Sequence, residues 1–271
     1  MPTLYIVATP IGNLEDISRR ALRTLDEVML IAAEDTRKTR RLLAAYDIKT
    51  PMTSYHEQNK RSKLSYILTK LEEGDVALVS EAGMPGISDP GYELIIATSE
   101  RDIPVVPIPG PSAVITALAV SGLPTNRFTY IGFLPRKSGE RRRRLESVAG
   151  ESGTIIALEA PHRLKETFND ILVTLGDRRV AVCRQLTKLH EEVFRGMTSQ
   201  ALEHFTCPRG EFTLVIGGKT DKEKPELTQD IEYKLRHMRF SGLTAKEAIA
   251  KVVGETGLSK KELYQIWVKL S

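Results

Sequence analysis

Short apolar segments alternate with amphipathic segments through the first part of the chain. The apolar segments lie at residues 4–8, 28–33, 76–79 and 103–108. They lack the apolar–polar alternation of a strand with one face in solvent, which is typical of a parallel sheet covered on both faces. Between them, apolar residues such as Ala21, Leu22 and Leu25 recur with helical spacing. The pattern predicts an α/β fold with β-α-β connections.

Three of these predicted strands end in loops rich in glycine and proline, at residues 9–13, 80–91 and 109–112. Glycine lets a backbone approach a ligand closely, and proline stiffens a loop. In the second loop, Ser88 or Asp89 is predicted to cap a helix that begins at Pro90. Any one loop is also compatible with a tight connector, an interpretation that we weigh below that of a ligand site. Because the carboxyl ends of parallel strands share one edge of a sheet, the three loops together predict one ligand site.

The pattern changes after Pro124, where predicted strands follow one another closely with fewer helices between them. They lie at residues 128–133, 154–158, 179–185, 191–196 and 213–216. Closely spaced strands cannot all be joined by crossover helices, so a mixed sheet is predicted.

The C-terminal part of the sequence is predicted to be helical. Residues 220–229 are charged, contain Pro225 and are predicted to form a linker, and helices are predicted at residues 227–238, 245–255 and 260–270. Two capping boxes, Thr244 with Glu247 and Ser259 with Glu262, precede the last two helices. A helix, a glycine-containing turn and a capped helix form the helix-turn-helix pattern. We therefore predict α/β domains at residues 1–109 and 110–220 and a three-helix tail at 221–271.

Composition places the chain among globular proteins of reducing compartments. Of its 271 residues, 41% are hydrophobic and 27% are charged. It has no apolar run of about 18 residues and no basic segment before its first apolar run, so neither a membrane span nor a signal peptide is expected. Cys183 and Cys207 are far apart and lack metal-ligand spacing. We expect a cytoplasmic protein without a disulfide framework or a metal site.

Familiar nucleotide and hydrolase motifs do not occur in the sequence. No G-x-G-x-x-G follows the first predicted strand, and no phosphate-binding G-x-x-x-x-G-K-[ST] or G-x-S-x-G is present. A nicotinamide-binding domain, a P-loop nucleotidase and an α/β-hydrolase are therefore disfavoured.

The net charge of +4 is unevenly distributed. Basic clusters occur at residues 37–41, 60–63 and 141–144. Charge runs are often only solvated faces, so a solvated surface and a polyanion partner are both open alternatives. The predicted last helix carries only Lys260, Lys261 and Lys269 as basic residues, which makes major-groove recognition by the tail a weak hypothesis.

The motifs together carry a resemblance to a known family. They are ATPIGNL at residues 8–14, AAEDTR at 32–37, SEAGMPGISDPG at 80–91, PGPSA at 109–113, GFLPRK at 132–137, EAPHR at 159–163 and RGEFTLVI at 209–216. In this combination the chain resembles the bacterial 16S ribosomal RNA (cytidine-2′-O)-methyltransferases of the tetrapyrrole-methylase-like superfamily. The resemblance covers residues 1–218, and the tail is similar to the family's helix-turn-helix appendage.

The resemblance implies a fold and an activity. The fold is two α/β domains of tetrapyrrole-methylase type, a parallel-sheet N-domain and a mixed-sheet second domain, with S-adenosylmethionine in the cleft between them. The activity is 2′-O-methylation of a cytidine ribose (family position cytidine 1402) in the decoding region of 16S rRNA within the 30S subunit, by a cytoplasmic homodimer.

Site residues follow from the resemblance motif by motif. The implied cofactor-binding residues are Pro10, Ala82, Gly83, Met84, Ile87, Ser112, Ala113, Glu159, Leu186 and Phe212. Met84 stands where tetrapyrrole enzymes have Asp, which disfavours a corrin or porphyrin substrate. Candidates for a general base are Glu34, Asp35, Glu81, His162 and Lys188, all near predicted strand ends. The residues expected to contact RNA phosphates are Arg37, Arg40, Arg41, Lys137, Arg141, Arg142, Arg143 and Arg144.

Two alternatives to the RNA methyltransferase remain at this point. One is a small-molecule methylase of the tetrapyrrole type, which the basic clusters and Met84 disfavour. The other is a DNA-binding regulator that acts through the helix-turn-helix tail.

Overall fold

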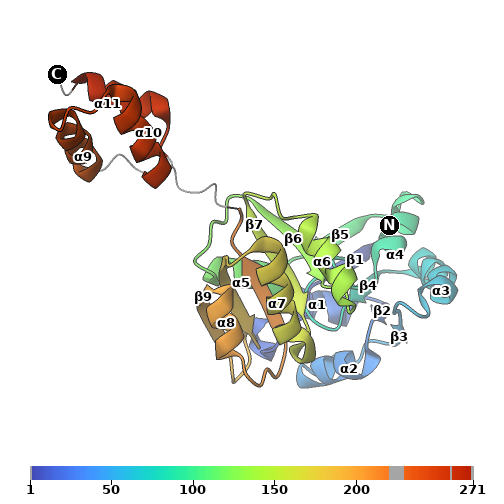
Figure 1. Ribbon diagram of the computed structural model, residues 1–271. Helices are drawn as coiled ribbons and strands as arrows, with labels where there is room; N and C mark the ends of the chain where they lie inside the picture. Colours follow the sequence, from blue (N-terminus) through green and yellow to red (C-terminus); the bar gives the residue numbers. More distant parts are fainter. Residues whose placement is uncertain (1, 220–228, 257, 270–271) are drawn as a thin grey trace. The chain divides into compact units, whose positions relative to one another are not determined.

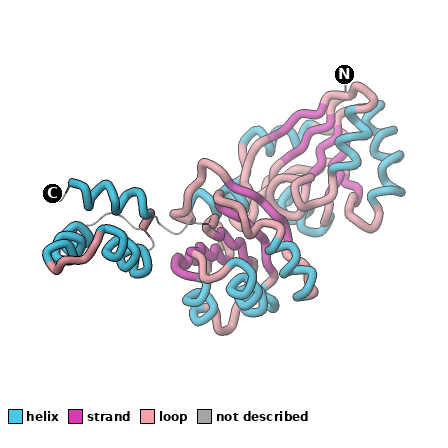
Figure 2. Tube along the Cα trace, turned by 45° about the horizontal axis from the view of Figure 1, so that its top comes forward, coloured by secondary structure: helices cyan, strands magenta, loops and turns pink. Residues whose placement is uncertain are grey.

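The computed structural model describes residues 2–219, 229–256 and 258–269, which form two compact units, Met1–Gly218 and Lys219–Ser271 (Figure 1). The predicted linker at residues 220–229 lies, except for residue 229, outside the described residues. In the first unit, the strands gather in two sheets with helices against them (Figure 2). The division of this unit at residue 109 stays a prediction.

The first sheet confirms the predicted parallel arrangement. Its strands are β1 (Leu4–Val7), β2 (Leu30–Ala33), β3 (Met52–Ser54), β4 (Val76–Val79) and β5 (Val105–Ile108), in the order β3-β2-β4-β1-β5 and all parallel. Every residue of β2 and β4 is buried. Full burial on both faces explains why these strands read as continuous apolar runs.

Helices cover both faces of this sheet. The segments are η1 (Leu14–Asp16), α1 (Arg19–Glu27), α2 (Thr36–Ala45), α3 (Lys60–Glu73) and α4 (Tyr92–Ser99). One face packs Ile31 and Val79 with the apolar side chains of α1 and α2. The other face packs Leu78 with Leu71 of α3 and Leu94 of α4. Because helices occupy both faces, the polar loops lie at the ends of the strands.

The second sheet is mixed, as predicted. Its strands are β6 (Phe128–Phe133), β7 (Thr154–Glu159), β8 (Arg179–Arg184), β9 (Glu192–Met197) and β10 (Phe212–Ile216), in the order β6-β7-β10-β8-β9. Only β6 and β7 pair in parallel, and the other pairs are antiparallel. Its helices are η2 (Pro161–Arg163), α6 (Ser138–Glu146), α7 (Leu164–Leu175) and α8 (Thr198–His204). The opposite face packs against α5 (Ala113–Val120), the helix that follows the first sheet.

Helix α4 begins at Tyr92, two residues later than the predicted start at Pro90. Neither Ser88 nor Asp89 caps it, and Pro90 lies outside it, because the N-cap is Gly91 with no side-chain hydrogen bond. Gly91 has φ of +154°, and a Cβ there would lie 2.9 Å from Leu78. The chain turns tightly against β4, and this turn keeps the Asp89 side chain away from the helix amides.

The basic run at residues 141–144 belongs to a helix, α6, and one of its members is buried. Arg141 is 0% exposed. Its Nε donates to Asp170 at 2.7 Å, and it also donates to the carbonyls of Pro135 and Arg136. The structure therefore contradicts the expectation that Arg141 contacts RNA. Its neighbours Arg143 and Arg144 are exposed, as a helix with one buried face requires.

Asp170 is the centre of this buried cluster. It accepts hydrogen bonds from Arg141, Arg142 and Ser138. Burial alone would raise the pKa of Asp170, but these hydrogen bonds outweigh it and hold the pKa below its ordinary value. The cluster joins α6 to α7, and both helices lie on the second sheet (Figure 1).

The second unit is a small helical domain with its own core. It contains α9 (Gln229–Phe240), α10 (Ala245–Thr256) and α11 (Lys260–Lys269), packed around Leu235, Val252, Leu263 and Trp267. The Thr244–Glu247 capping box is confirmed, since the Thr244 amide donates to Glu247 Oε2 at 3.0 Å and the Glu247 amide donates to Thr244 Oγ1 at 3.4 Å. The Ser259 hydroxyl likewise accepts from the Glu262 amide.

Replacing Asp170 with Asn is expected to lower the free energy of unfolding by about 3–5 kcal/mol, because it removes the buried counter-charge of the Arg141 guanidinium and leaves only the exposed Glu166 carboxylate at 3.5 Å. Urea denaturation followed by circular dichroism measures the change. Arg143→Gln, on the same helix but exposed, is the control and should stay within about 0.5 kcal/mol of the wild type. A D170N variant as stable as this control would contradict the assignment.

Candidate functional site

The loops at the carboxyl ends of the first sheet meet the second sheet around a cavity of about 460 Å³. The first sheet contributes the loops after β1, β2, β4 and β5, so the predicted convergence of the glycine- and proline-rich loops is confirmed. The cavity is lined by Ile11, Glu34, Glu81, Ala82, Gly83, Met84, Ile87, Ser88, Asp89, Ser112, Ala113, Val114, Tyr130, Phe133, Leu158, Glu159, Ala160, Pro161, Cys183, Leu186, Gly210, Glu211, Phe212 and Thr213. Its volume is within the range of sites for small ligands and cofactors, about 300–1,000 Å³.

Backbone hydrogen bonds fix the loop after β4. Thr9 and Gly83 form an isolated antiparallel bridge, in which each amide donates to the other carbonyl at 2.9 and 3.0 Å. The Ser80 hydroxyl donates to the Gly83 carbonyl at 3.2 Å. The Glu81 amide donates to the Glu34 carboxylate at 2.9 Å. The loop is therefore tied to the strand ends on both sides, and its shape is set before any ligand binds.

Three carboxyl groups face one another at this edge. Glu34 and Glu81 line the cavity together with Asp89, and Lys38 forms an ion pair with Glu81. Burial raises the pKa of Asp89 to about 6, and the negative charges of Glu34 and Glu81 raise it as well. A hydrogen bond from Ser80 lowers this pKa but does not offset the other effects. Asp89 was predicted to be a helix cap, and the structure places it in the cavity wall instead.

A hydroxyl pair connects the two sheets across the cavity. The Ser88 hydroxyl, in the loop after β4, forms a hydrogen bond with the Tyr130 hydroxyl on β6. Burial raises the pKa of Tyr130, and the nearby Asp89 carboxylate raises it further. Tyr130 therefore stays a neutral phenol, which can donate one hydrogen bond and accept another at the mouth of the site.

The start of α5 supplies backbone donors. Ser112 caps the helix by accepting from the Ile115 amide, and its carbonyl accepts from the Thr116 amide. The amides of Ala113 and Val114 have no acceptor within the described part of the chain, as expected for the first positions of a helix. Both residues line the cavity, so a ligand carboxylate, hydroxyl or ring nitrogen can accept from them.

The second sheet supplies a largely apolar wall. Leu186, Phe212 and Cys183 are buried and line the cavity, and burial raises the pKa of the Cys183 thiol to about 11. Glu159 also lines it, but its carboxylate is already bound by the Arg163 guanidinium at 2.7 Å and the Thr167 hydroxyl at 2.6 Å. The Glu159 carboxylate thus anchors the end of β7.

The cavity gathers most of the residues predicted for a cofactor. Of that set, all but Pro10 line it: Ala82, Gly83, Met84, Ile87, Ser112, Ala113, Glu159, Leu186 and Phe212. The sequence prediction missed Ile11, Ser88 and Asp89, which lie in loops already singled out, so loop membership was the available signal. It also missed Tyr130 and Cys183, which lie on strands of the second sheet outside the motifs that carried the prediction.

Only Glu34 and Glu81 among the candidate bases line the cavity. Asp35 caps α2 and accepts from the Arg37 and Lys38 amides, and the hydrogen bond from Arg37 holds its pKa below the ordinary value. Lys188 forms an ion pair with Glu211 at 2.9 Å. Asp35 and Lys188 therefore do not line the cavity into which Glu34, Glu81 and Asp89 extend.

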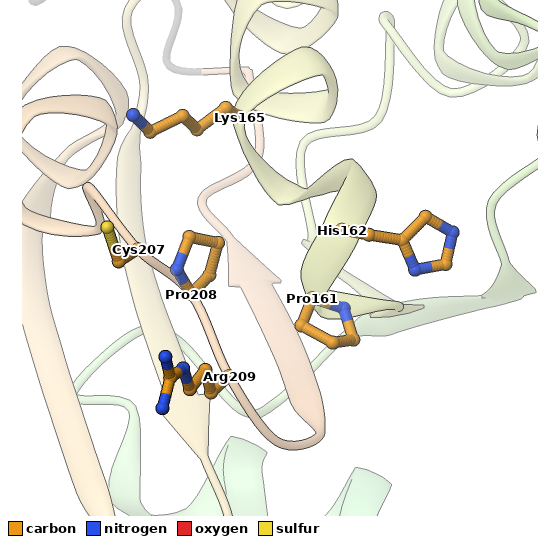
Figure 3. Close-up of a pocket in the computed structure, with 6 residues that line it drawn as sticks. All are labelled: Pro161, His162, Lys165, Cys207, Pro208 and Arg209. Carbon is orange, nitrogen blue, oxygen red and sulfur yellow. The ribbon is translucent and has the colours of Figure 1, made fainter.

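His162 lies at a second, smaller cavity of about 210 Å³, shown in Figure 3. Its lining residues are Pro161, His162, Lys165, Cys207, Pro208 and Arg209. The His162 ring points to the other side of η2 from Lys165, Cys207 and Arg209 (Figure 3). Pro161 lines both cavities, so the two are neighbours.

The remaining residues predicted to contact RNA lie outside the large cavity. They are Arg37, Arg40, Arg41, Lys137, Arg142, Arg143 and Arg144, and each is exposed. Lys137 forms an ion pair with Glu140 at 3.5 Å, and Arg142 donates to Asp170. Their contacts with RNA stay predictions.

The described residues include no group of three or more His, Cys, Asp or Glu side chains placed to hold a metal ion. In the same part of the chain, no helix combines the length and apolar character needed to cross a membrane.

Comparisons with a family model and with curated proteins both find methylases similar to this chain. The family model described as Tetrapyrrole (Corrin/Porphyrin) Methylases matches residues 3–202. A protein of Synechocystis sp. named Ribosomal RNA small subunit methyltransferase I is 47% identical, covering 100% of this chain and 99% of that protein. A protein of Thermotoga maritima with the same name is 52% identical, covering 81% of this chain and 100% of that protein.

A solved structure shares the fold at lower identity. The uroporphyrin-III C-methyl transferase of Thermus thermophilus, complexed with S-adenyl homocysteine, is similar with a TM-score of 0.56 and 19% identity, covering 79% of this chain and 97% of that chain. The predicted tetrapyrrole-methylase fold is thereby confirmed.

Replacing Glu34 with Gln should lower the pKa of Asp89 from about 6 toward its ordinary value of 3.8, because one facing negative charge is removed while the side-chain carbonyl still accepts from Glu81. Carboxyl carbon NMR titration measures this pKa. The control is Glu27→Gln, an exposed residue of α1. An Asp89 that titrates identically in the wild type and both variants would refute the proposed charge coupling.

Proposed function

We propose that this chain, which belongs to the tetrapyrrole (corrin/porphyrin) methylase family, is an S-adenosylmethionine-dependent methyltransferase of the small-subunit ribosomal RNA. It is closely similar to proteins that are named for this RNA. The acceptor in this proposal is a cytidine 2′-hydroxyl in the decoding region. The observation that carries the proposal is the cavity at the carboxyl ends of the first sheet, with carboxyl groups on one side and free helix amides on another.

The residues present fit this cofactor. Apolar side chains such as Ile11, Met84 and Leu186 suit its adenosine and methionine carbon atoms. The Ala113 and Val114 amides can donate to its polar atoms. The carboxyl groups of Glu34, Glu81 and Asp89 complement the positive charges of its sulfonium and amino groups. When bound, S-adenosylmethionine supplies an electrophilic methyl group.

The chain itself contributes positioning above all. The Thr9–Gly83 bridge and the Ser88–Tyr130 hydrogen bond hold both walls of the cavity in place. Holding reacting groups in line contributes up to roughly 7–11 kcal/mol in favourable cases. The proton of the acceptor hydroxyl must also leave, and the Glu34 and Glu81 carboxylates are the predicted bases that line the cavity.

Lys38 and Glu81 form an exposed pair at the rim, close to the other basic residues of α2. In this proposal α2 and the exposed arginines of α6 contact RNA phosphates, which fix the register of the strand without reading its bases. The RNA is that of the 30S subunit, which assigns the protein to the cytoplasm.

We further propose a homodimer. Several large apolar side chains of the first unit are exposed, among them Tyr92 at 66%, Ile115 at 54% and Leu189 at 93%. Exposed apolar side chains in this number suit a partner surface. Light scattering of the purified protein distinguishes a dimer from a monomer.

Replacing Asp89 with Asn should weaken S-adenosylmethionine binding about 10- to 100-fold, because a carboxylate that pairs with a cation is lost. In the wild type, affinity should also fall as the pH drops through about 6, where Asp89 takes up a proton, and this dependence should vanish in the variant. Isothermal titration calorimetry measures both effects, with Asp26→Asn on α1 as the matched control. Unchanged affinity in D89N would exclude this contact.

The proposed activity is tested with small ribosomal subunits from cells that lack this protein. The purified enzyme and S-adenosylmethionine should yield 2′-O-methylcytidine in their rRNA, detected by nucleoside mass spectrometry, and D89N at the same cofactor concentration should yield much less. Methylation of precorrins without methylation of rRNA would instead identify a small-molecule methylase.

A further inference from the structure

The second cavity lies beside the proposed methyl-transfer site and is formed by the same two segments. Pro161 of η2 lines both cavities. In the loop before β10, Arg209 lines the small cavity, and the adjacent Gly210 lines the large one. A molecule that extends out of the large cavity along these segments therefore enters the small one.

Two of the side chains that line this cavity, those of Lys165 and Arg209, are long and positively charged. Both side chains are exposed, and neither forms a hydrogen bond or ion pair within the described part of the chain. No carboxylate is among the lining residues. Three glutamates, Glu159, Glu166 and Glu211, lie close to these residues in sequence, and each already forms an ion pair, with Arg163, Arg141 and Lys188 respectively. The local field is therefore positive, and two cations are free to bind an anion.

The loop that carries Arg209 is held in a fixed conformation. The Arg184 guanidinium donates to the Arg209 carbonyl at 2.8 Å. Gly210 has φ of +97°, and a Cβ there would lie 2.3 Å from Gln185, so the loop packs directly on the end of β8. Little ordering is left for binding, which favours affinity.

The shape of the cavity suits a unit of an RNA strand. Its volume of about 210 Å³ lies below the range of about 300–1,000 Å³ for cofactor-sized ligands. Pro161 and Pro208 give it an apolar surface beside the two cations. One phosphate with the adjoining ribose matches this combination of size, positive charge and apolar wall.

We propose that this second cavity binds the phosphodiester next to the acceptor nucleotide, with Lys165 and Arg209 as the phosphate ligands. The inference rests on the proposed RNA methyltransferase activity and adds the site that positions the strand. A phosphate held in the small cavity, which shares Pro161 with the large one, fixes how far the acceptor ribose enters the large cavity.

The surrounding surface continues the positive charge. Lys165 is on α7, and α7 packs against α6, whose Arg143 and Arg144 are exposed. An RNA strand bound at the small cavity therefore has further basic side chains on the neighbouring helix.

The first test is RNA affinity in Lys165→Gln, Arg209→Gln and the double variant. Each single change should weaken binding of a single-stranded RNA containing the target sequence about three- to tenfold, and each should reduce the slope of log affinity against log salt concentration by about 0.7. S-adenosylmethionine affinity should be unchanged. Arg23→Gln is the matched control, because Arg23 on α1 is exposed and its side chain has no partner among the residues that the structure describes.

Wild-type RNA affinity and salt slope in the double variant would overturn the proposal, while leaving the methyltransferase activity in place. If the wild-type enzyme methylates no rRNA, the proposed function fails as well, and the two failures are thereby distinguished.

The second test uses the cysteines as reporters. Cys207 is exposed in the cavity, whereas Cys183 is buried with its pKa raised to about 11 and serves as an unreactive internal reference. Saturating RNA should slow maleimide labelling of Cys207 at least about tenfold, and S-adenosylmethionine alone or inorganic phosphate alone should not. Equal labelling rates with and without RNA would remove the strand from this cavity. Protection by inorganic phosphate but not by RNA would replace the RNA assignment with a free-anion site.

Discussion

The backbone bridge between Thr9 and Gly83 is the constraint on which the site depends. It ties the loop after β4 to the end of β1, the neighbouring strand of the parallel sheet. Parallel strands direct all their carboxyl ends to one edge, and a loop there is free to take many shapes unless its backbone is paired. With the bridge formed, Ala82, Met84 and Asp89 have fixed positions in the cavity wall.

Removal from water has opposite consequences for the carboxyl groups of Asp170 and Asp89. Asp170 is surrounded by donors, so its carboxylate stays ionised and joins two helices. Asp89 faces other carboxyl groups in a partly desolvated wall, so its ionised form is disfavoured without a cation nearby. The first arrangement stabilises the fold. The arrangement at Asp89 places mutually repelling carboxylates together, and a positively charged ligand would relieve this repulsion. For this reason the proposal places the cofactor there.

The C-terminal unit is a separate folding element with a core around Trp267 and Leu263. The Thermotoga maritima relative is matched over its whole length, but the match covers only 81% of this chain. The part of this chain outside the match is about as long as the C-terminal unit. The cavities and the basic residues used in the proposals all belong to the first unit. All the residues on which the proposed methyl-transfer site rests therefore come from the first unit.

The order of apolar runs and glycine- and proline-rich loops by itself determined the parallel sheet, the mixed sheet and the loops of the first sheet that meet at the cavity, because these features depend on local spacing and on where strands end. The roles of Arg141 and Asp89 were decided only by tertiary structure. In the sequence Arg141 is one of four equivalent arginines, and packing of α6 on α7 buries it alone. Asp89 has the sequence context of a helix cap, but the turn at Gly91 directs it into the cavity. Tyr130 and Cys183 join the site because strands of the second sheet line the same cavity as loops of the first, which brings together segments that are distant in sequence.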